Sequence, residues 1–399
     1  MCGNTKPSVL FVDDEQNILD GLRRSLRGKR GEWEMAFATG GERALDLLAE
    51  SPYDVIVSDM RMPRMDGAAL LTRVSEHHPQ VGRVVLSGHI DPDATIRVAI
   101  AGHRFLTKPS MTEQVAAVVD QLLVRTSSEH DSAVRRIAGG VRAVPSPPQQ
   151  RDRVLGLIAP DVDAAVAAHA VLHDVGLTAK LLQLSNSRFF GFQPRNSSIE
   201  SIVHSIGIPM VQAVIRAGQA LPVAAWDPAI ERHLEAARRH SVATAYLVDQ
   251  IASPANRPHA QAAAILQEVG RLICLAPTAG DPAPDVDLAG QTRDGVPFRD
   301  VGVELLHLWG IHPPIVAAVA HRDTPQSPDP SGLGVTASVR TAHLLVQRTE
   351  SAFPDAGPAT EELAELLSHP QLRARGVDWG RAAEEASRRA GEWAGRDGR

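Results

Sequence analysis

The chain has 399 residues, with 41 Lys and Arg against 47 Asp and Glu, which gives a net charge of −6. A hydrophobic fraction of 43% supports packed cores in two or three domains, and 4% aromatic residues leave few stacking platforms for single-stranded nucleic acid. The acidic balance disfavours a protein that coats DNA or a membrane. Two cysteines, no signal-peptide pattern and no apolar run of about eighteen residues lead us to expect a cytoplasmic protein.

Residues 1–125 alternate β-branched runs with helical patterns. We predict strands at Ser8–Val12, Trp33–Ala38, Val55–Asp59, Val81–Ser87 and Arg104–Leu106. The predicted helices are Gln16–Arg27, Gly41–Glu50, Ala68–His77, Asp93–Ala101 and Met111–Arg125. The continuous apolar run within the third strand is typical of a central parallel strand that is covered on both faces. This order predicts a doubly wound α/β fold with a five-stranded parallel sheet, whose site lies at the carboxyl ends of its strands.

The rest of the chain contains almost no strand signal. Residues 127–152 are predicted to be a helical and Pro-rich linker, because Val141–Gln150 holds three prolines that stiffen and extend a chain. Residues 153–350 are predicted to form an all-α domain, followed by a helical tail at residues 351–399. The predicted helices of that domain are Ala164–His173, Leu177–Asn186, Ile199–Ile206, Val211–Ala220, Ala229–Ile251, Ala260–Ala276, Arg299–Trp309, Ile315–His321 and Val335–Arg348.

Acidic side chains stand at the ends of two predicted strands. Asp13 and Asp14 follow the first strand and Asp59 ends the third, so their mutual repulsion predicts a cation between them. Mg²⁺ suits such a site, since it takes one or two carboxylates and keeps several waters. Ser87 ends the fourth strand and Lys108 follows the fifth, and both can bind phosphoryl oxygens. A carboxylate that attacks phosphorus forms an aspartyl phosphate, so Asp59 is the predicted acceptor.

These positions lie in four motifs that resemble a response-regulator receiver domain, the CheY-like, flavodoxin-like fold. The motifs are Val12-Asp13-Asp14-Glu15, Ser58-Asp59-Met60-Arg61-Met62-Pro63 with Asp66-Gly67, Leu86-Ser87-Gly88 and Leu106-Thr107-Lys108-Pro109. The resemblance covers residues 6–126 and implies phosphorylation of Asp59 by a histidine kinase. It further implies Mg²⁺ on Asp13, Asp14, Asp59 and the backbone carbonyl of Arg61. Ser87 and Phe105 match the paired switch residues, and Lys108 matches the phosphate-binding lysine.

The segment Leu177–Gly191 resembles the start of the HDOD domain, a helical relative of the HD metal-dependent phosphohydrolases. HD enzymes bind metal through histidines and a His-Asp doublet on separate helices. Where that doublet would fall, this chain has Gln267-Glu268, and Phe298 or one of its neighbours stands at another histidine position. The doublets His130-Asp131 and His173-Asp174 occur elsewhere in the sequence. The resemblance spans about residues 153–350 and implies a degenerate metal site.

We therefore expect a two-component response regulator whose non-catalytic HDOD output binds a protein partner or a second copy of the chain. We expect neither nucleic acid nor a membrane as its partner. One alternative is a metal-dependent phosphohydrolase, such as a cyclic-dinucleotide phosphodiesterase, with a variant site at His240, Glu268, His321 and His343. The other alternative, a nucleic-acid regulator, is disfavoured by the charge and by the lack of a helix-turn-helix with a basic recognition face.

Overall fold

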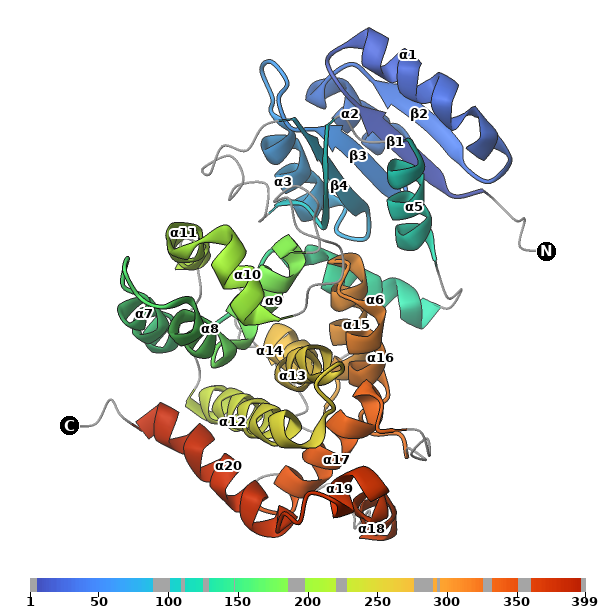
Figure 1. The fold of residues 1–399 in the computed structure, drawn as a ribbon. Coiled ribbons are helices and arrows are strands. Elements are labelled where there is room, and N and C mark those ends of the chain that lie inside the picture. Colours follow the sequence, from blue (N-terminus) through green and yellow to red (C-terminus); the bar gives the residue numbers. More distant parts are fainter. Residues whose placement is uncertain are drawn as a thin grey trace. The chain divides into compact units, whose positions relative to one another are not determined.

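The computed structural model describes residues 6–88, 101–108, 112–124, 129–146, 148–185, 198–219, 228–275, 290–292, 295–325, 332–350 and 360–395. The chain divides into two compact units, which are coloured by sequence in Figure 1. The first contains the described parts of 1–143, 183–194 and 304–310, and the second contains the described parts of 144–182, 195–303 and 311–399. Among the described residues, none of the helices is long and apolar enough to cross a membrane.

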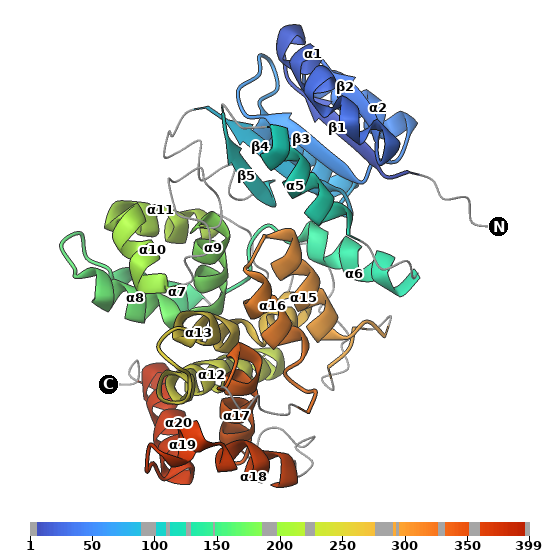
Figure 2. The ribbon, with the colours of Figure 1, turned by 45° about the vertical axis from the view of Figure 1, so that its right-hand side comes forward.

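The first unit contains a parallel five-stranded sheet in the order β2-β1-β3-β4-β5. Its strands are β1 (Ser8–Val12), β2 (Glu34–Ala38), β3 (Val55–Asp59), β4 (Gly82–Ser87) and β5 (Arg104–Thr107). Figure 2 shows β5 beside β4. All of β3 is buried, as its apolar run predicts, and it lies between β1 and β4. The predicted doubly wound fold is confirmed, and the carboxyl ends of β1, β3 and β4 meet at one edge.

Helices accompany the sheet of the first unit. They are α1 (Gln16–Ser25), α2 (Gly41–Glu50), α3 (Gly67–His77) and α5 (Thr112–Leu123), of which the last three contact strands. The predicted helix Gln16–Arg27 ends earlier and continues as a 3₁₀ helix, η1 (Leu26–Gly31), because two glycines weaken the α-helix there. The predicted helix Asp93–Ala101 lies outside the described residues except for its last residue, and residues 186–191 of the HDOD-like motif also lie outside them.

Helix α6 (Glu129–Gly140) belongs to the first unit, although the sequence places it in a linker. The guanidinium of Arg83 in β4 is fully buried and donates a 2.8 Å hydrogen bond to the backbone carbonyl of Gly139. A Cβ on Gly139 would stand 2.0 Å from the carbonyl oxygen of Pro79, so the helix approaches the backbone before β4 very closely. This helix is therefore packed against the body that carries the sheet.

The remaining chain is helical, as predicted. Its elements are α7 (Pro148–Leu157), α8 (Ala164–Leu172), α9 (Val175–Ser185), α10 (Ile199–Ile206), α11 (Ile208–Gln219), α12 (Pro228–Ile251), α13 (Arg257–Leu266), α14 (Val269–Leu275), α15 (Phe298–Leu308), α16 (Pro313–Ala320), α17 (Val335–Gln347), α18 (Thr360–Ser368), α19 (Pro370–Arg373) and α20 (Trp379–Gly395). The long helix α12 packs against α13, α17 and α20. The tail thus supplies helices to the same packed body.

Two predicted segments differ from the structure. The extended linker over Val141–Gln150 gives way to helix at Pro148, because proline lacks the N–H that the first helical turn leaves unpaired anyway. The single helix predicted at Ala260–Ala276 is broken at Gln267-Glu268 into α13 and α14. At this break, the carbonyl of Gln267 accepts a 2.6 Å hydrogen bond from the Arg322 side chain.

Candidate functional site

The carboxylates predicted to bind the metal ion lie at one edge of the sheet. Asp13 directly follows β1 and Asp59 ends the adjacent strand β3, and their side chains are buried, whereas Asp14 is exposed. The backbone N–H of Glu15 donates to Asp13 Oδ1 at 2.9 Å, and that of Arg61 donates to Asp59 Oδ2 at 2.8 Å. These bonds fix the orientation of each carboxylate.

Lys108 connects the two buried carboxylates. Its Nζ lies 2.7 Å from Asp13 Oδ2 and also forms an ion pair with Asp59 Oδ1. Burial raises the pKa of Asp59 above its usual value, although Lys108 opposes this effect. Burial on its own lowers the pKa of the Lys108 ammonium, but hydrogen bonds to Asp13 and Asp59 raise it overall. The ammonium is therefore firmly protonated beside a desolvated carboxylate.

The predicted switch residues lie on the two neighbouring strands β4 and β5. Ser87 ends β4 and pairs with Thr107, and its carbonyl accepts a 2.8 Å hydrogen bond from the Lys108 N–H. Phe105 pairs with Val85, and its side chain is already buried, with 6% of its surface exposed. Ser87 thus lies at the same sheet edge as Asp59, and Phe105 lies two residues before Thr107.

A glycine after β3 allows a close backbone approach at Asp59. A Cβ on Gly67 would stand 2.1 Å from the backbone oxygen of Asp59. The preceding residue, Asp66, caps α3 by accepting a 2.8 Å hydrogen bond from the N–H of Ala69. The Asp66-Gly67 pair therefore starts α3 directly against the end of β3, a steric role that the motif alone does not reveal.

The donors at this edge suit a hard divalent cation. They are the carboxylates of Asp13, Asp14 and Asp59 and the backbone carbonyl of Arg61, which are all oxygen ligands. The ammonium of Lys108 shows that two of these carboxylates converge on one positive charge. No group of three or more His, Cys, Asp or Glu side chains in the described ranges is arranged to hold a metal. Mg²⁺ does not require one, since it binds through one or two carboxylates and waters.

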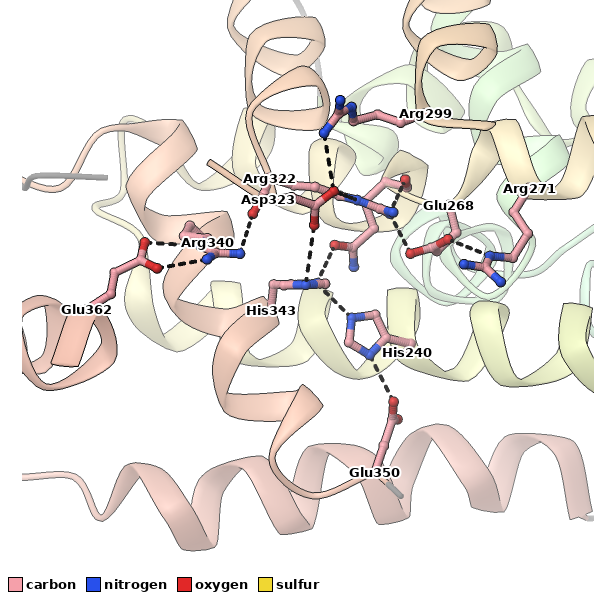
Figure 3. Close-up of polar contacts among 11 residues, drawn as sticks. His240, Glu268, Arg271, Arg299, Arg322, Asp323, Arg340, His343, Glu350 and Glu362 are labelled. Atoms are coloured by element: carbon pink, nitrogen blue, oxygen red, sulfur yellow. Dashed lines mark hydrogen bonds and ion pairs between the residues drawn. The ribbon is translucent and has the colours of Figure 1, made fainter. Parts of the chain in front are cut away.

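A second polar cluster lies within the second unit (Figure 3). His240 of α12 is buried, and its Nε2 lies 2.8 Å from Nδ1 of His343 on α17. Nδ1 of His240 lies 2.8 Å from Oε2 of Glu350. His343 Nδ1 also lies 3.2 Å from Oε1 of Gln267, and burial holds the pKa of His343 well below its usual value. The two imidazoles therefore bind each other.

Arginines bind the remaining predicted acid of this cluster. Glu268, with 4% of its surface exposed, forms an ion pair with Arg322 through Oε1 and lies 3.2 Å from Arg271 Nε through Oε2. His321, a predicted ligand, is exposed at the end of α16, whereas the next residue contributes its guanidinium to the cluster. The structure therefore brings His240, Glu268 and His343 into one cluster. Arg322, rather than the predicted His321, completes that cluster.

Sequence patterns do not single out Arg322, because an arginine that follows a helix is ordinarily solvated. The one available signal is the run His321-Arg322-Asp323 directly after an apolar helix, which superficially resembles a kinase catalytic loop. Arg322 binds Gln267 and Glu268, which are more than fifty residues away in the sequence, so no local spacing predicts these contacts.

The His-Asp doublets serve other purposes where they are described. His173 Nε2 lies 2.9 Å from the hydroxyl of Tyr246. Asp174 Oδ1 accepts hydrogen bonds from the Ser146 hydroxyl at 2.6 Å and the Leu177 N–H at 2.8 Å, and thus caps the start of α9. The side chains of His130 and Asp131 on α6 lie outside the described part of the chain.

The sequence matches the response regulator receiver domain over residues 9–120 and the HDOD domain over residues 144–325. The chain belongs to the response regulators, with a receiver domain followed by an HDOD domain. The second match ends before α17, which supplies His343 to the polar cluster.

The relatives match part of the chain. The transcriptional regulatory protein PrrA of Mycobacterium tuberculosis is 35% identical over 162 residues, which are 40% of this chain and 67% of PrrA. The DNA-binding transcriptional regulator NtrC of Klebsiella pneumoniae is 36% identical over 114 residues, so this chain spans 24% of NtrC. A solved signal receiver domain of an HD domain-containing protein from Pseudomonas fluorescens Pf-5 is 29% identical, with a TM-score of 0.29, over 32% of this chain and 99% of that chain.

Proposed function

We propose that Asp59 accepts a phosphoryl group from a histidine kinase in the presence of Mg²⁺, and that this modification switches a non-catalytic HDOD output domain. The proposal is carried by the convergence of the Asp13 and Asp59 carboxylates on the ammonium of Lys108. A desolvated carboxylate beside a fixed cation is a suitable nucleophile for a phosphoryl group, because the cation neutralises the charge that arrives.

In the transfer, a carboxylate oxygen of Asp59 forms a bond to phosphorus. The bond between phosphorus and the imidazole nitrogen of the donor breaks, and its electron pair stays on that nitrogen. The Lys108 ammonium and the Ser87 hydroxyl bind the oxygens of the transferred group. Asp13, Asp14, Asp59 and the Arg61 carbonyl would hold Mg²⁺, which supplies further positive charge to the phosphoryl oxygens.

The switch passes through β4 and β5. A phosphoryl group that draws the Ser87 hydroxyl toward itself changes the packing around Phe105, which lies buried on the neighbouring strand. Such a change biases a two-state surface formed with the last receiver helix, expected at Met111–Arg125 and described as α5. The output then gains or loses a protein partner, or a second copy of the chain, in the cytoplasm.

Three contacts support a non-catalytic output. Metal-assisted hydrolysis needs a cation held by several converging ligands. His240 and His343 bind each other, and Glu268 already binds arginine on both of its oxygens. Two imidazoles that a variant HD site would need thus bind each other, and its carboxylate binds two arginines.

Phosphorylation of Asp59 is tested by incubating the whole protein with acetyl phosphate and Mg²⁺ and measuring the intact mass. We expect one added phosphoryl group, which EDTA or the change Asp59→Asn abolishes. Asp66→Asn is the matched control, because asparagine caps a helix as well as aspartate does and leaves Asp59 in place. An added group that persists in the Asp59→Asn protein would show that another residue is the acceptor.

The phosphohydrolase alternative predicts different results. The purified whole protein would then contain stoichiometric Fe, Mn, Zn or Ni and would turn over bis-p-nitrophenyl phosphate or cyclic di-GMP. We expect neither. Turnover that both His240→Ala and Glu268→Ala abolish would replace the non-catalytic proposal with the enzyme.

A further inference from the structure

We infer that the guanidinium of Arg322 takes the place of a metal ion in the second, helical unit. The chain itself then supplies the positive charge that a metal ion would otherwise provide at this site. The inference deepens the proposed non-catalytic function, because it names the group that makes metal binding unnecessary at this position.

The first observation concerns the buried carboxylate. Glu268 stands at the break between α13 and α14, and 4% of its surface is exposed. A carboxylate removed from water needs a countercharge, since its desolvation is otherwise very unfavourable. Arg322 supplies that charge at Oε1, and Arg271 supplies a second at Oε2. The acid is retained at the expected ligand position, and its cation is covalently part of the protein.

The second observation concerns the surroundings of Arg322. Its Nη1 contacts Oε1 of Glu268 and donates to the backbone carbonyl of Gln267 at 2.6 Å, and its Nε lies 3.3 Å from Oδ2 of Asp323. Oxygen atoms from the helix break and from the turn after α16 thus converge on one positive charge. Such a shell of oxygen atoms is also what a hard or borderline metal ion attracts.

The third observation concerns the groups around this charge. Asp323 Oδ1 lies 3.9 Å from Nε2 of His343, while Nδ1 of that histidine is bonded within the cluster. Glu268, Asp323 and His343 lie around the side chain of Arg322 (Figure 3), but as placed they are not arranged to hold a metal ion, so in a protein with a shortened Arg322 they would have to move toward one another to bind one. Two carboxylates and one imidazole form a donor set that suits Zn²⁺ or Mn²⁺.

The position of Arg322 is itself fixed by other residues. Arg340 of α17 donates a 2.8 Å hydrogen bond to the backbone carbonyl of Arg322. The same guanidinium holds both carboxylate oxygens of Glu362 on α18, at 3.0 and 2.7 Å. Helices beyond the matched HDOD segment therefore anchor the residue that neutralises the site.

The test compares the whole wild-type protein with Arg322→Ala, using Mn²⁺ and Zn²⁺ as probes in calorimetric titration and thermal unfolding. We expect the wild type to bind neither metal at this cluster, so that any metal it takes up lies at the acidic site of the receiver, and to keep the Tm of the second unit when they are added. Arg322→Ala should lower the Tm of the second unit by about 5 °C or more, because Glu268 loses a partner. One equivalent of either metal more than the wild type takes up should then bind and restore most of that loss.

Two further variants keep the inference testable if Arg322→Ala folds poorly. Arg322→Lys retains a positive charge, so it should unfold nearer to wild type and bind no more metal than wild type. Arg322→Ala combined with Glu268→Gln removes the unpaired acid, and should recover stability without gaining metal binding. A double variant as unstable as Arg322→Ala would contradict the inference.

Arg299→Ala is the matched control, since Arg299 is also an arginine that contacts Asp323, but from a more exposed position. We expect it to unfold like wild type and to bind no more metal than wild type. The inference fails if Arg322→Ala resembles this control in both measurements while the wild type is metal-free. Stoichiometric metal with turnover in the wild type would instead overturn the proposed non-catalytic output. Acetyl phosphate labelling of Asp59 is a separate readout, which we expect to persist in every Arg322 variant.

Discussion

At the residue scale, two opposing effects set the pKa of the Asp59 carboxyl. Burial next to Asp13 raises the pKa of its carboxyl, whereas hydrogen bonding and charge attraction from Lys108 lower it. The first effect prevails, so the acceptor binds a proton more readily than an ordinary aspartate. Since the nucleophile is the deprotonated form, acidity should limit the reaction before it limits that of an exposed carboxylate.

The first prediction is a pH profile. In Mg²⁺-free protein the carboxyl of Asp59 should titrate around a midpoint above the ordinary aspartate pKa. Lys108→Met removes the group that lowers the pKa, so its midpoint should move to higher pH, and its rate of labelling by acetyl phosphate with Mg²⁺ should fall by about 10-fold or more. The NMR shift of the Asp59 carboxyl carbon between about pH 3 and 8, and initial labelling rates near pH 7, check the two statements. A midpoint at or below the ordinary value in the metal-free wild type would contradict the description of Asp59 as desolvated.

The convergence of Asp13, Asp59 and Lys108 could be predicted from the sequence, but the contacts of the helical cluster could not. Asp13, Asp59 and Lys108 each stand directly at a strand end, and parallel strands bring such ends to one edge, so local patterns suffice. The pairing of Glu268 with Arg322 joins a helix break to a turn far along the chain. Nothing in the sequence around an arginine tells whether it faces water or a buried carboxylate.

At the element scale, close backbone contacts decide where helices lie. The predicted single helix around Gln267 is broken, and α14 then packs against the start of α15. A Cβ on Gly270 would stand 1.7 Å from the backbone oxygen of Phe298, so no larger residue fits without moving a helix. The sequence shows Gly270 inside an apolar helical pattern, which does not reveal this contact.

The second prediction concerns that contact. Gly270→Ala should lower the free energy of unfolding of the helical unit by about 3 kcal/mol or more, because a backbone oxygen cannot turn aside as a side chain can. Gly28→Ala is the control, since no atom lies within 4 Å of the Cβ position there. Calorimetric unfolding of both variants checks the difference. Equal transitions in the two proteins would show that α14 and α15 are not packed in this way.

The third prediction concerns α6. Arg83→Met removes hydrogen bonds to the carbonyls of Ala101 and Gly139, so α6 should be held less firmly to the first unit, where its own Arg135 still donates to the carbonyls of Gln80 and Leu122. We expect destabilisation by about 2 kcal/mol or more, and faster amide exchange throughout α6.

Arg142→Met is the comparison for that prediction. The side chain of Arg142 forms an ion pair with the half-exposed Glu76, and its loss should cost at most about 1 kcal/mol. Exchange rates in α6 that are equal in Arg83→Met and wild type would mean that this helix is held by something other than the buried arginine.

At the scale of the whole molecule, a receiver domain and an HDOD domain follow each other in one chain, and each contains its own cluster of charged side chains. The sequence predicted the order of the two domains, which the family matches confirm. It assigned α6 to a linker and α18 to a tail, yet α6 is packed with the sheet and α18 supplies the carboxylate of Glu362 to the polar cluster. Both helices are held by buried arginines, whose partners are visible only once the chain is folded.

The central claim is that phosphorylation of Asp59 changes the helical output domain. Hydrogen–deuterium exchange of the whole protein, with and without acetyl phosphate and Mg²⁺, tests it most directly. We predict altered exchange in β4 and β5, altered exchange in helices of the output domain, and neither change in Asp59→Asn protein. Fully phosphorylated wild-type protein whose exchange changes only within residues 6–126 would contradict the claim.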